Sequence, residues 1–487
     1  MPTTPTTAGH TRRDSRPLAL VWFRNDLRLA DNPALQAALE GGYVPVPVYI
    51  HAPEEHGTWA PGAASNAWRH RSLAALDADL VARGSRLRRF FGPSMASLQT
   101  LVAATGAEAV FWNRRYEPRI QQRDIRIKRA LRGSGVRAES FNGALLFEPW
   151  ELKTKQDTPF KVFGPFWRSA LASWRLAQTH EAPARLPTAE IDLKGVPLEA
   201  LKLAPLRGWD QQFWDEWQPG EAGAHAALDA FTDGALRGYA GQRDRPDRTG
   251  TSRLSPHLHF GEIAPWRVVT MLEAERGRGS GGDIDVAIKE LGWREFAHYL
   301  LHHFPHSAEE HLNPRFATFD WAQVGQHALD AWCSGRTGVP IVDAGMRQLW
   351  ATGWMHNRVR MIVASYLTKH LRYHWLHGAR WFWDTLVDAD LASNTLGWQW
   401  VAGTGADAAP YFRIFNPVTQ AERFDRDGRY IARWVPELAS LPVPLRFAPW
   451  RDVDALRQAA PGYPPRPLVD LGQGRAAALA AYARSRG

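Results

Sequence analysis

Apolar positions follow two different patterns along the chain. Between residues 17 and 145, short apolar runs alternate with segments in which apolar residues recur at helical spacing, as in residues 66–83. The short runs are LALVWF (Leu18–Phe23), VPVPVYI (Val44–Ile50), RLRRFF (Arg86–Phe91) and AVFWN (Ala109–Asn113). Alternation of this kind predicts a parallel, Rossmann-like sheet covered by helices. No G-x-G-x-x-G follows the first run, so the usual dinucleotide-binding motif is missing there.

The remaining sequence divides into two parts. Residues 146–220 are rich in proline and only weakly periodic, which is typical of a long connection over the surface. From residue 221 to residue 487 helical spacing dominates, which predicts an all-α domain. The first residues, MPTTPTTAGHTRRDSRP, are polar and lack the apolar core of a signal peptide, so we expect a disordered tail over residues 1–16.

Composition narrows the class of protein. A chain of 487 residues is too long for one ordinary core, and its apolar content of 45% is normal for a globular protein. No apolar run of about 18 residues is present, so no membrane-spanning helix is expected. The single cysteine, Cys333, excludes a disulfide framework and a cysteine-ligated zinc or iron–sulfur site. We therefore expect a protein of the reducing cytoplasm.

The charge balance is basic, with 59 lysines and arginines against 50 acidic residues. A net charge of +9 is a modest argument for a nucleic-acid partner. Arginine far outnumbers lysine, which favours bidentate phosphate contacts. A GC-rich coding sequence would also enrich arginine, so charge alone does not decide the partner.

The most informative segment is residues 353–417, which is rich in tryptophan and arginine. Asp388 and Asp390 lie there within the apolar sequence LVDADLA. Burial excludes such charges unless they are paired. Apolar planes combined with paired charges suit a flat, redox-active ligand with polar edges better than they suit a plain core.

This segment and four further motifs, in matching order, resemble the DNA photolyase and cryptochrome family. The motifs are WFRNDLRLADNPAL (Trp22–Leu35), YAGQRDRPDRTGTSRLSPHLHFGEI (Tyr239–Ile263), ELGWREF (Glu290–Phe296) and GRTGVPIVDAGMRQLWATGWMHN (Gly335–Asn357). The resemblance implies an α/β antenna domain over residues 17–145, an interdomain linker over 146–220 and a helical FAD-binding domain over 221–487. It also implies FAD as cofactor, active in its fully reduced form FADH−.

The resemblance assigns FAD contacts to several stretches. The turn GTSRLS (Gly250–Ser255) offers hydroxyl and backbone N–H groups to phosphates, although alone it would indicate an ordinary helix N-cap. Arg360 and Asp388 would pair over the isoalloxazine ring, Asp390 would accept from its polar edge, and Asn394 would face flavin N5. The full set is Tyr239, Thr251, Ser252, Arg253, Leu254, Ser255, Glu290, Trp293, Arg294, Asn357, Arg360, Asp388, Ala389, Asp390 and Asn394.

Three tryptophans resemble the family's electron relay to the flavin: Trp398, Trp375 and Trp321. The first two stand in the motifs GWQW and YHW. The spacing from Trp321 to Trp332 is one residue longer than the family pattern, so Trp332 stays an alternative third member.

The lesion site is also assigned by resemblance. An enzyme that acts on a base within duplex DNA flips it out, and the handling of a flipped lesion needs aromatic walls, for which Trp293 and Trp400 are candidates. Glu290 and Asn357 would bond the pyrimidine edges. Enzymes for (6-4) photoproducts carry histidine at two positions that are Asn357 and Met361 here, a pattern that matches enzymes for cyclobutane dimers.

Phosphate contacts are implied for Arg243, Arg358 and Gln420. Exposed arginines are mostly solubilising, but some of the neighbouring ones would extend a DNA-binding patch. These are Arg245, Arg248, Arg423 and Arg426.

Two other features were weighed. His298, His302 and His306 are spaced four apart as metal ligands on a helix would be, but no third type of ligand accompanies them, and we expect no metal. Folate-binding relatives carry an Asn-Glu pair where this chain has Arg119 and Ile120. The antenna chromophore therefore stays open among folate, a deazaflavin, another pigment and none.

The resemblance implies a monomeric deoxyribodipyrimidine photo-lyase, a carbon–carbon lyase. It would repair cyclobutane pyrimidine dimers in DNA by electron transfer from photoexcited reduced FAD to the flipped-out dimer. The alternative is a cryptochrome-type blue-light photoreceptor without repair activity. A weaker third hypothesis is a flavin-binding protein that recognises DNA structure and has lost catalysis.

Overall fold

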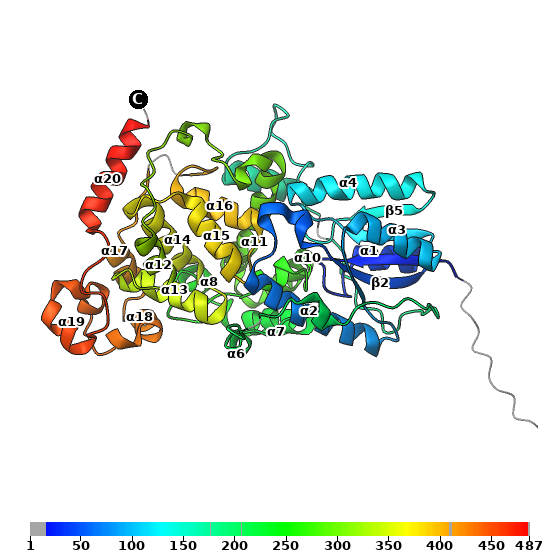
Figure 1. Cartoon of the computed structure of the whole chain (residues 1–487), viewed down its shortest axis with the longest axis horizontal. Helices are drawn as coiled ribbons and strands as arrows, with labels where there is room; N and C mark the ends of the chain where they lie inside the picture. Colours follow the sequence, from blue (N-terminus) through cyan, green and yellow to red (C-terminus); the bar gives the residue numbers. More distant parts are fainter. Residues whose placement is uncertain (1–15, 176, 206, 409–411, 486–487) are drawn as a thin grey trace, which may run out of the picture.

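The structure is a computed structural model that describes residues 16–175, 177–205, 207–408 and 412–485. Most of the predicted N-terminal tail lies outside the described residues. An α/β domain and a helical domain lie side by side along the longest axis of the molecule (Figure 1). The fold class predicted from the sequence is confirmed.

The N-terminal sheet is fully parallel and has the strand order β3-β2-β1-β4-β5. Its strands are β1 (Leu18–Phe23), β2 (Val44–His51), β3 (Arg88–Phe91), β4 (Ala109–Asn113) and β5 (Arg137–Phe141). Four of these agree with the apolar runs of the sequence. The fifth strand, β5, was not predicted because its sequence RAESF is polar and only one of its residues is buried.

Helices cover both faces of this sheet. They are α1 (Pro33–Glu40), α2 (Ala63–Ala82), α3 (Ser94–Thr105) and α4 (Pro118–Gly133). Val21 and Phe23 of β1 enter one apolar core with residues of α1 and α2. Leu20 and Trp22 enter a second core with residues of α3 and α4. Successive residues of a strand point to opposite faces, so β1 is buried on both sides.

The connecting segment differs from the prediction in one respect: it contains a helix, α5 (Phe163–Ser173), besides the short η2 (Leu198–Leu201) and α6 (Phe213–Glu216). Phe163, Phe166, Trp167 and Ala170 of α5 are buried. These positions follow the i, i+3, i+4, i+7 spacing of an amphipathic helix. They pack into the same core as Phe296 and Tyr299, so this part of the linker belongs to the helical domain.

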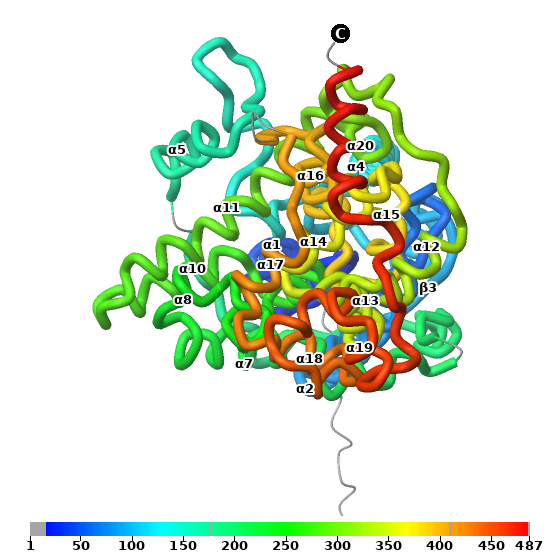
Figure 2. Tube along the Cα trace, turned by 90° about the vertical axis from the view of Figure 1, so that its left-hand side faces the viewer, coloured from blue at the N-terminus to red at the C-terminus, as the bar shows by residue number. Residues whose placement is uncertain are grey.

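The first helix after residue 220 is α7 (Glu221–Ala230). The helices that follow are η3 (Phe231–Ala235), α8 (Tyr239–Gln242), α9 (Ser255–His259), α10 (Pro265–Ala274), α11 (Gly281–His303), α12 (Gln326–Cys333), α13 (Pro340–Thr352), α14 (Asn357–Ser365), η7 (Tyr366–His370), α15 (Trp375–Thr385), α16 (Leu391–Ala402), α17 (Pro417–Phe424), α18 (Arg429–Trp434), α19 (Val453–Ala459) and α20 (Leu471–Arg484). Short 3-10 turns are η1 (Pro53–Trp59), η4 (Arg276–Arg278), η5 (Pro305–Ala308), η6 (Pro314–Phe316), η8 (Pro436–Leu438), η9 (Leu445–Phe447) and η10 (Pro449–Arg451). Figure 2 shows α20 running along the outside of this domain.

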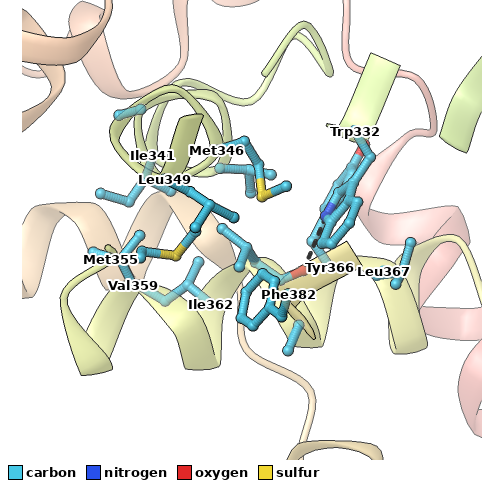
Figure 3. Close-up of a cluster of buried hydrophobic side chains, with 14 of the residues drawn as sticks. Trp332, Ile341, Met346, Leu349, Met355, Val359, Ile362, Tyr366, Leu367 and Phe382 are labelled. Carbon is cyan, nitrogen blue, oxygen red and sulfur yellow. Dashed lines mark hydrogen bonds between the residues drawn. The ribbon is translucent and has the colours of Figure 1, made fainter. Parts of the chain in front are cut away.

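The largest core of the helical domain is built from α13, α14, η7, α15 and α16. Figure 3 shows part of it, with Met346, Met355 and Ile362 packed between helices and Trp332 at one side. The indole N–H of Trp332 donates a 3.2 Å hydrogen bond to the carbonyl oxygen of Val363. Trp332 is therefore a satisfied core residue with no exposed surface.

Buried hydrogen bonds join the two domains. The backbone N–H of Leu27 donates to the carbonyl of Phe260 over 3.0 Å, and the indole of Trp68 donates to Glu262 over 2.9 Å. These contacts hold the segment after α9 against α2 and against the residues that follow β1. Among the described residues, no helix is long and apolar enough to cross a membrane.

Candidate cofactor and substrate site

A cavity of about 160 Å³ opens in the helical domain between α14 and α16. Eight residues singled out from the sequence line it. They are Asn357, Arg360, Met361, Asp388, Ala389, Asp390, Asn394 and Trp398. The other lining residues are Ala364, Phe382, Leu386, Ser393, Gly397 and Val401.

Arg360 and Asp388 form the predicted ion pair on the wall of this cavity. Their Nη2 and Oδ2 atoms lie 2.8 Å apart, and Arg360 Nε donates to the carbonyl of Met355 over 2.7 Å. The second oxygen of Asp388, Oδ1, is buried and has no hydrogen-bond partner among the residues that the structure describes. A buried acceptor of this kind costs free energy until a donor reaches it. Asp388 therefore offers an acceptor to a ligand.

Asn394 is held by a hydrogen bond from its amide nitrogen to the carbonyl of Ala379, over 3.0 Å. The amide oxygen is then the group that Asn394 has left for a ligand in the cavity. An acceptor suits a ring nitrogen that carries a proton.

Asp390 lies where α16 begins, and each of its oxygens faces a polar partner. Oδ1 accepts from the backbone N–H of Ser393 over 2.8 Å. Oδ2 lies 3.3 Å from Nε2 of His298 and 3.7 Å from Nδ1 of His259. Burial alone would raise the pKa of Asp390, but the two imidazoles hold it well below its usual range.

Sequence reasoning missed His259 and considered His298 only as a metal ligand. His259 follows the GTSRLS turn in α9, and His298 lies on α11 four residues after Arg294, one helical turn further along. These spacings are visible in the sequence. Their approach to Asp390 depends on how α9 and α11 pack against the start of α16, which local spacing does not give.

The GTSRLS turn is joined to Arg360 by Trp354, which was also missed. The indole of Trp354 donates to Ser255 Oγ over 3.3 Å, and the guanidinium groups of Arg253 and Arg360 lie 5.3 Å and 5.9 Å from the centre of its ring. Arg253 also pairs with Glu216 over 2.8 Å. The turn and the ion pair therefore border one region of the protein.

Other FAD residues implied by the resemblance lie outside the lining of this cavity. Tyr239 and Leu254 are buried. Arg294 donates to the carbonyls of Ala144 and Leu258, which fixes α11 against neighbouring segments. Thr251 and Ser252 are half-buried beside Leu254.

The cavity fits a flavin. One part of its wall carries hydrogen-bonding groups from Arg360, Asp388, Asp390 and Asn394. Asn357 and Ser393 add further polar groups, and the apolar lining includes Ala364, Phe382, Leu386, Trp398 and Val401. A flat ring with polar groups on one edge matches this division, and the unpaired oxygen of Asp388 gives such an edge an acceptor.

The predicted tryptophan relay begins at this cavity. Trp398 is buried, and its ring lies 5.0 Å from that of Phe382 and 6.2 Å from that of Trp332. Trp375 is buried without exposed surface, and Trp321 is half-buried.

A histidine links the two outer tryptophans. Trp375 Nε1 donates to Nδ1 of His311 over 3.2 Å, and the ring of His311 stacks on Trp321 at 5.9 Å and 15°. Trp332, the alternative third member, lies inside the core next to Trp398.

The candidate lesion contacts lie on several elements. Asn357 is exposed and Met361 half-buried on α14, where both line the cavity. Burial raises the pKa of Glu290, and Arg243, 2.5 Å away, partly opposes that shift. The pKa of this carboxyl therefore lies above its ordinary value even though Arg243 pairs with it.

The two aromatic walls differ. Trp293 stacks face to face on Phe163 at 3.7 Å and 9°, so one of its faces is already covered. Trp400 is half-buried, and its indole donates to the carbonyl of Asp407 over 3.1 Å. That bond fixes the ring beside the segment that follows α16.

Several arginines of the expected DNA contact carry acidic partners. Arg358 pairs with Asp244 over 2.8 Å, and Arg245 pairs with Asp247 over 2.6 Å. Gln420 is half-buried on α17. The most exposed basic side chains of the set are Arg248, Arg423 and Arg426.

The three histidines weighed as metal ligands diverge. His298 faces Asp390, and Nδ1 of His302 lies 3.3 Å from the side-chain oxygen of Gln121. His306 lies in η5 and lines another cavity. Within the part of the chain that the structure describes, no three His, Cys, Asp or Glu side chains form a group able to hold a metal ion.

That second cavity, of about 310 Å³, lies between the two domains. Arg119 and Ile120, which replace the Asn-Glu pair of folate-binding relatives, line it together with Trp59 and Trp383. Arg119 and Ile120 therefore face an open space between the domains.

Comparisons with known proteins agree on one family. Residues 19–188 match the model described as DNA photolyase, and residues 287–484 match the FAD binding domain of DNA photolyase. The deoxyribodipyrimidine photo-lyase of Agrobacterium fabrum is 47% identical over 95% of this chain and 97% of its own length. Cryptochrome-1 of Arabidopsis thaliana is 38% identical over 94% of this chain and 69% of its own.

Among solved structures, a bacterial class III photolyase from Agrobacterium tumefaciens superimposes with a TM-score of 0.92 at 45% identity. The match covers 98% of this chain and 100% of that one. The similarity therefore extends over both domains.

Proposed function

Because the chain belongs to the DNA photolyase and cryptochrome family, we propose that it is a photolyase that repairs cyclobutane pyrimidine dimers in DNA. Its helical domain matches the FAD-binding domain of that family, and FAD is its cofactor. Arg360, Asp388, Asp390 and Asn394 would hold FAD, which in its reduced form would supply light-driven electron transfer to the lesion. The protein contributes binding, orientation and electrostatics.

The observation that carries the choice of lesion is the pair Asn357 and Met361. Both line the same cavity as Arg360 and Asp388. An amide and a thioether offer no strong general acid at neutral pH. Splitting a cyclobutane ring needs an electron and no proton donor, so this pair supports the dimer over a (6-4) photoproduct.

The cofactor residues act by holding a flat ring in one orientation. Arg360 and Asp388 fix one another, and Asp388 keeps an acceptor for the ligand. Asp390 and Asn394 are both held by backbone groups, so little motion has to be lost when the ligand binds. Such preorganisation keeps the site ready for electron transfer.

The substrate residues act on a flipped base. Trp400 supplies a stacking surface, and a protonated Glu290 would donate a hydrogen bond to a pyrimidine carbonyl. Arg243, Arg358 and Gln420 would contact phosphates, with the exposed Arg248, Arg423 and Arg426 around them. DNA binding would then weaken steeply as salt rises. We expect the protein to act as a monomer.

The alternative is a photoreceptor, since the family also contains cryptochromes such as the Arabidopsis relative. A photolyase and a photoreceptor of this family would both use FAD and the tryptophan relay. They differ in their need for damaged DNA.

A measurement of DNA binding in the dark and then after illumination separates the photolyase from the photoreceptor. The FAD-loaded, reduced protein is titrated onto a duplex with one thymine dimer and onto the same undamaged duplex, with fluorescence anisotropy as readout. A photolyase binds the damaged duplex at least about a thousandfold more tightly, in the range of specific DNA recognition, and releases it on illumination. Equal affinity for both duplexes, unchanged by light, would favour the photoreceptor.

A further inference from the structure

His298 has a hydrogen-bond environment that fixes where its protons lie. Its Nδ1 is 3.0 Å from the carbonyl oxygen of Arg294. A carbonyl can only accept, so Nδ1 must carry a proton. Its Nε2 then faces Oδ2 of Asp390 at 3.3 Å. In a neutral ring that nitrogen would present a lone pair to a carboxylate, which is repulsive. One proton must therefore lie between His298 and Asp390.

That proton belongs to His298. Asp390 is surrounded by donors, because Ser393 N–H bonds its Oδ1 and the ring of His259 lies 3.7 Å from its Oδ2. Nε2 of His259 lies 3.5 Å from the amide nitrogen of Asn25, a donor, which leaves Nδ1–H of His259 for Asp390. Donors favour the charged carboxylate, and an imidazole is the stronger base of the two groups.

The surroundings support the same assignment. Burial alone would lower the pKa of His298, but the charge of Asp390 outweighs burial and leaves it raised. The other titratable or charged groups near this histidine, on α9, on α11 and before α4, are His259, Arg294, Glu295 and Tyr116.

We infer that His298 is a buried imidazolium that serves as the counter-ion of Asp390 and thereby allows the cavity to hold an anionic cofactor. Arg360 with Asp388, and His298 with Asp390, make two pairs of opposite charge around one cavity. The four charges cancel. If a neutral side chain replaced His298, the wall would carry one uncompensated carboxylate, which would repel an anion brought next to it.

The role of His298 rests on the proposed function only in the identity of the anion, the reduced form of FAD. It makes His298 a positioning residue: it acts through Asp390. The positive charge of His298 stabilises the anionic, reduced form of FAD more than it stabilises the oxidised form.

The first test is the protonation of His298 in the full chain without FAD. The titration of its ring is followed by NMR of labelled histidine, and His298→Gln identifies the signal. A pKa above the ordinary value of 6.5, with both nitrogens protonated at pH 6, is expected. A ring that titrates below 6.5 would overturn the inference, whether or not the protein repairs DNA.

The second test is the reduction potential of bound FAD. His298→Gln keeps an N–H donor for Asp390 and removes the charge, whereas His298→Arg keeps a charge that cannot be lost. His303→Gln, on the same helix but bonded to the carbonyl of Pro149, is the matched control.

In His298→Gln the affinity for reduced FAD should fall at least tenfold relative to oxidised FAD, a shift of about −30 mV for a two-electron couple. His298→Arg should restore most of it, and His303→Gln should not move it. Equal potentials in wild type and His298→Gln would refute the role of the charge. Failure of the repair assay with these results intact would reject the proposed function alone.

Discussion

The indole nitrogen of Trp375 donates a 3.2 Å hydrogen bond to Nδ1 of His311. Burial lowers the pKa of His311 to about 4, so this imidazole is neutral at pH 7 and free to accept a proton. The same ring stacks on Trp321. A tryptophan that loses an electron becomes far more acidic at its N–H group, and His311 is the acceptor in contact with it.

Replacing His311 should slow the light-driven reduction of the oxidised, FAD-loaded protein. In His311→Leu, Trp375 has no acceptor for its proton, and we expect the rate to fall several-fold. The absorbance of the flavin under illumination with an external reductant measures it. His327→Leu, at an exposed position of α12, is the control. Equal rates in wild type and His311→Leu would exclude a role for this hydrogen bond.

Trp398 and Trp332 can be compared directly. The centres of their rings lie 6.2 Å apart, but only Trp398 lines the cavity. Trp398→Phe should block photoreduction of the oxidised protein and leave repair intact once FAD has been reduced chemically. Trp332→Phe should preserve photoreduction. Loss of photoreduction in Trp332→Phe alone would reverse the assignment.

Asp388→Asn should loosen the cofactor site. It removes the charge partner of Arg360, and breaking a largely buried ion pair costs about 3 kcal/mol. We expect a lower free energy of unfolding in urea and a lower ratio of FAD to protein after purification. Asp454→Asn, at a carboxylate that is 96% exposed, should change neither quantity. Full FAD content in Asp388→Asn would contradict the role of this pair.

Glu295 should give stability an unusual dependence on pH. Its buried carboxyl accepts from the backbone N–H groups of Leu146 and Phe147, and burial raises its pKa from 4.5 to about 7. The folded protein therefore binds a proton between these values that the unfolded chain has lost. The free energy of unfolding should fall by on the order of 3 kcal/mol as pH rises through that window.

The variant Glu295→Gln keeps an oxygen for both N–H groups and cannot ionise. Its free energy of unfolding, from urea titrations between pH 4.5 and 8, should lack this decline. Parallel pH profiles for wild type and variant would show that Glu295 is ionised throughout.

Trp400→Ala should weaken binding of dimer-containing DNA by about 1–3 kcal/mol, the value of one base–aromatic stack. Affinity for undamaged duplex should stay the same, because stacking requires a flipped base. Trp150→Ala, at an exposed tryptophan outside the cavity, provides the comparison. An equal loss of affinity for both duplexes would show that Trp400 maintains the fold and does not stack on the lesion.

The sequence predicted most of the fold because its signals are local. Strands β1, β2 and β4 are apolar on both faces, and their runs stand out. The polar strand β5 gave no such signal, because its neighbour β4 supplies the pairing that makes it a strand. Helix α5 had a helical spacing, but the proline-rich sequence around it concealed it.

The residues of the site also divide into those with a local sequence signal and those without one. Arg360, Asp388, Asp390 and Asn394 could be named because they stand in recognisable motifs, and the structure brings them to one cavity. The contacts of His259, His298 and His311 could not be predicted. Their partners lie on distant segments of the chain, so their roles exist only after the helices have packed.

The central claim is best tested by the product of repair. The reduced protein is illuminated with an oligonucleotide that carries one thymine dimer and, separately, with one that carries a (6-4) photoproduct at the same position. Chromatography against dark controls should find intact thymines restored from the dimer alone. No restoration from either lesion, with FAD bound and reduced, would contradict the assignment as a photolyase.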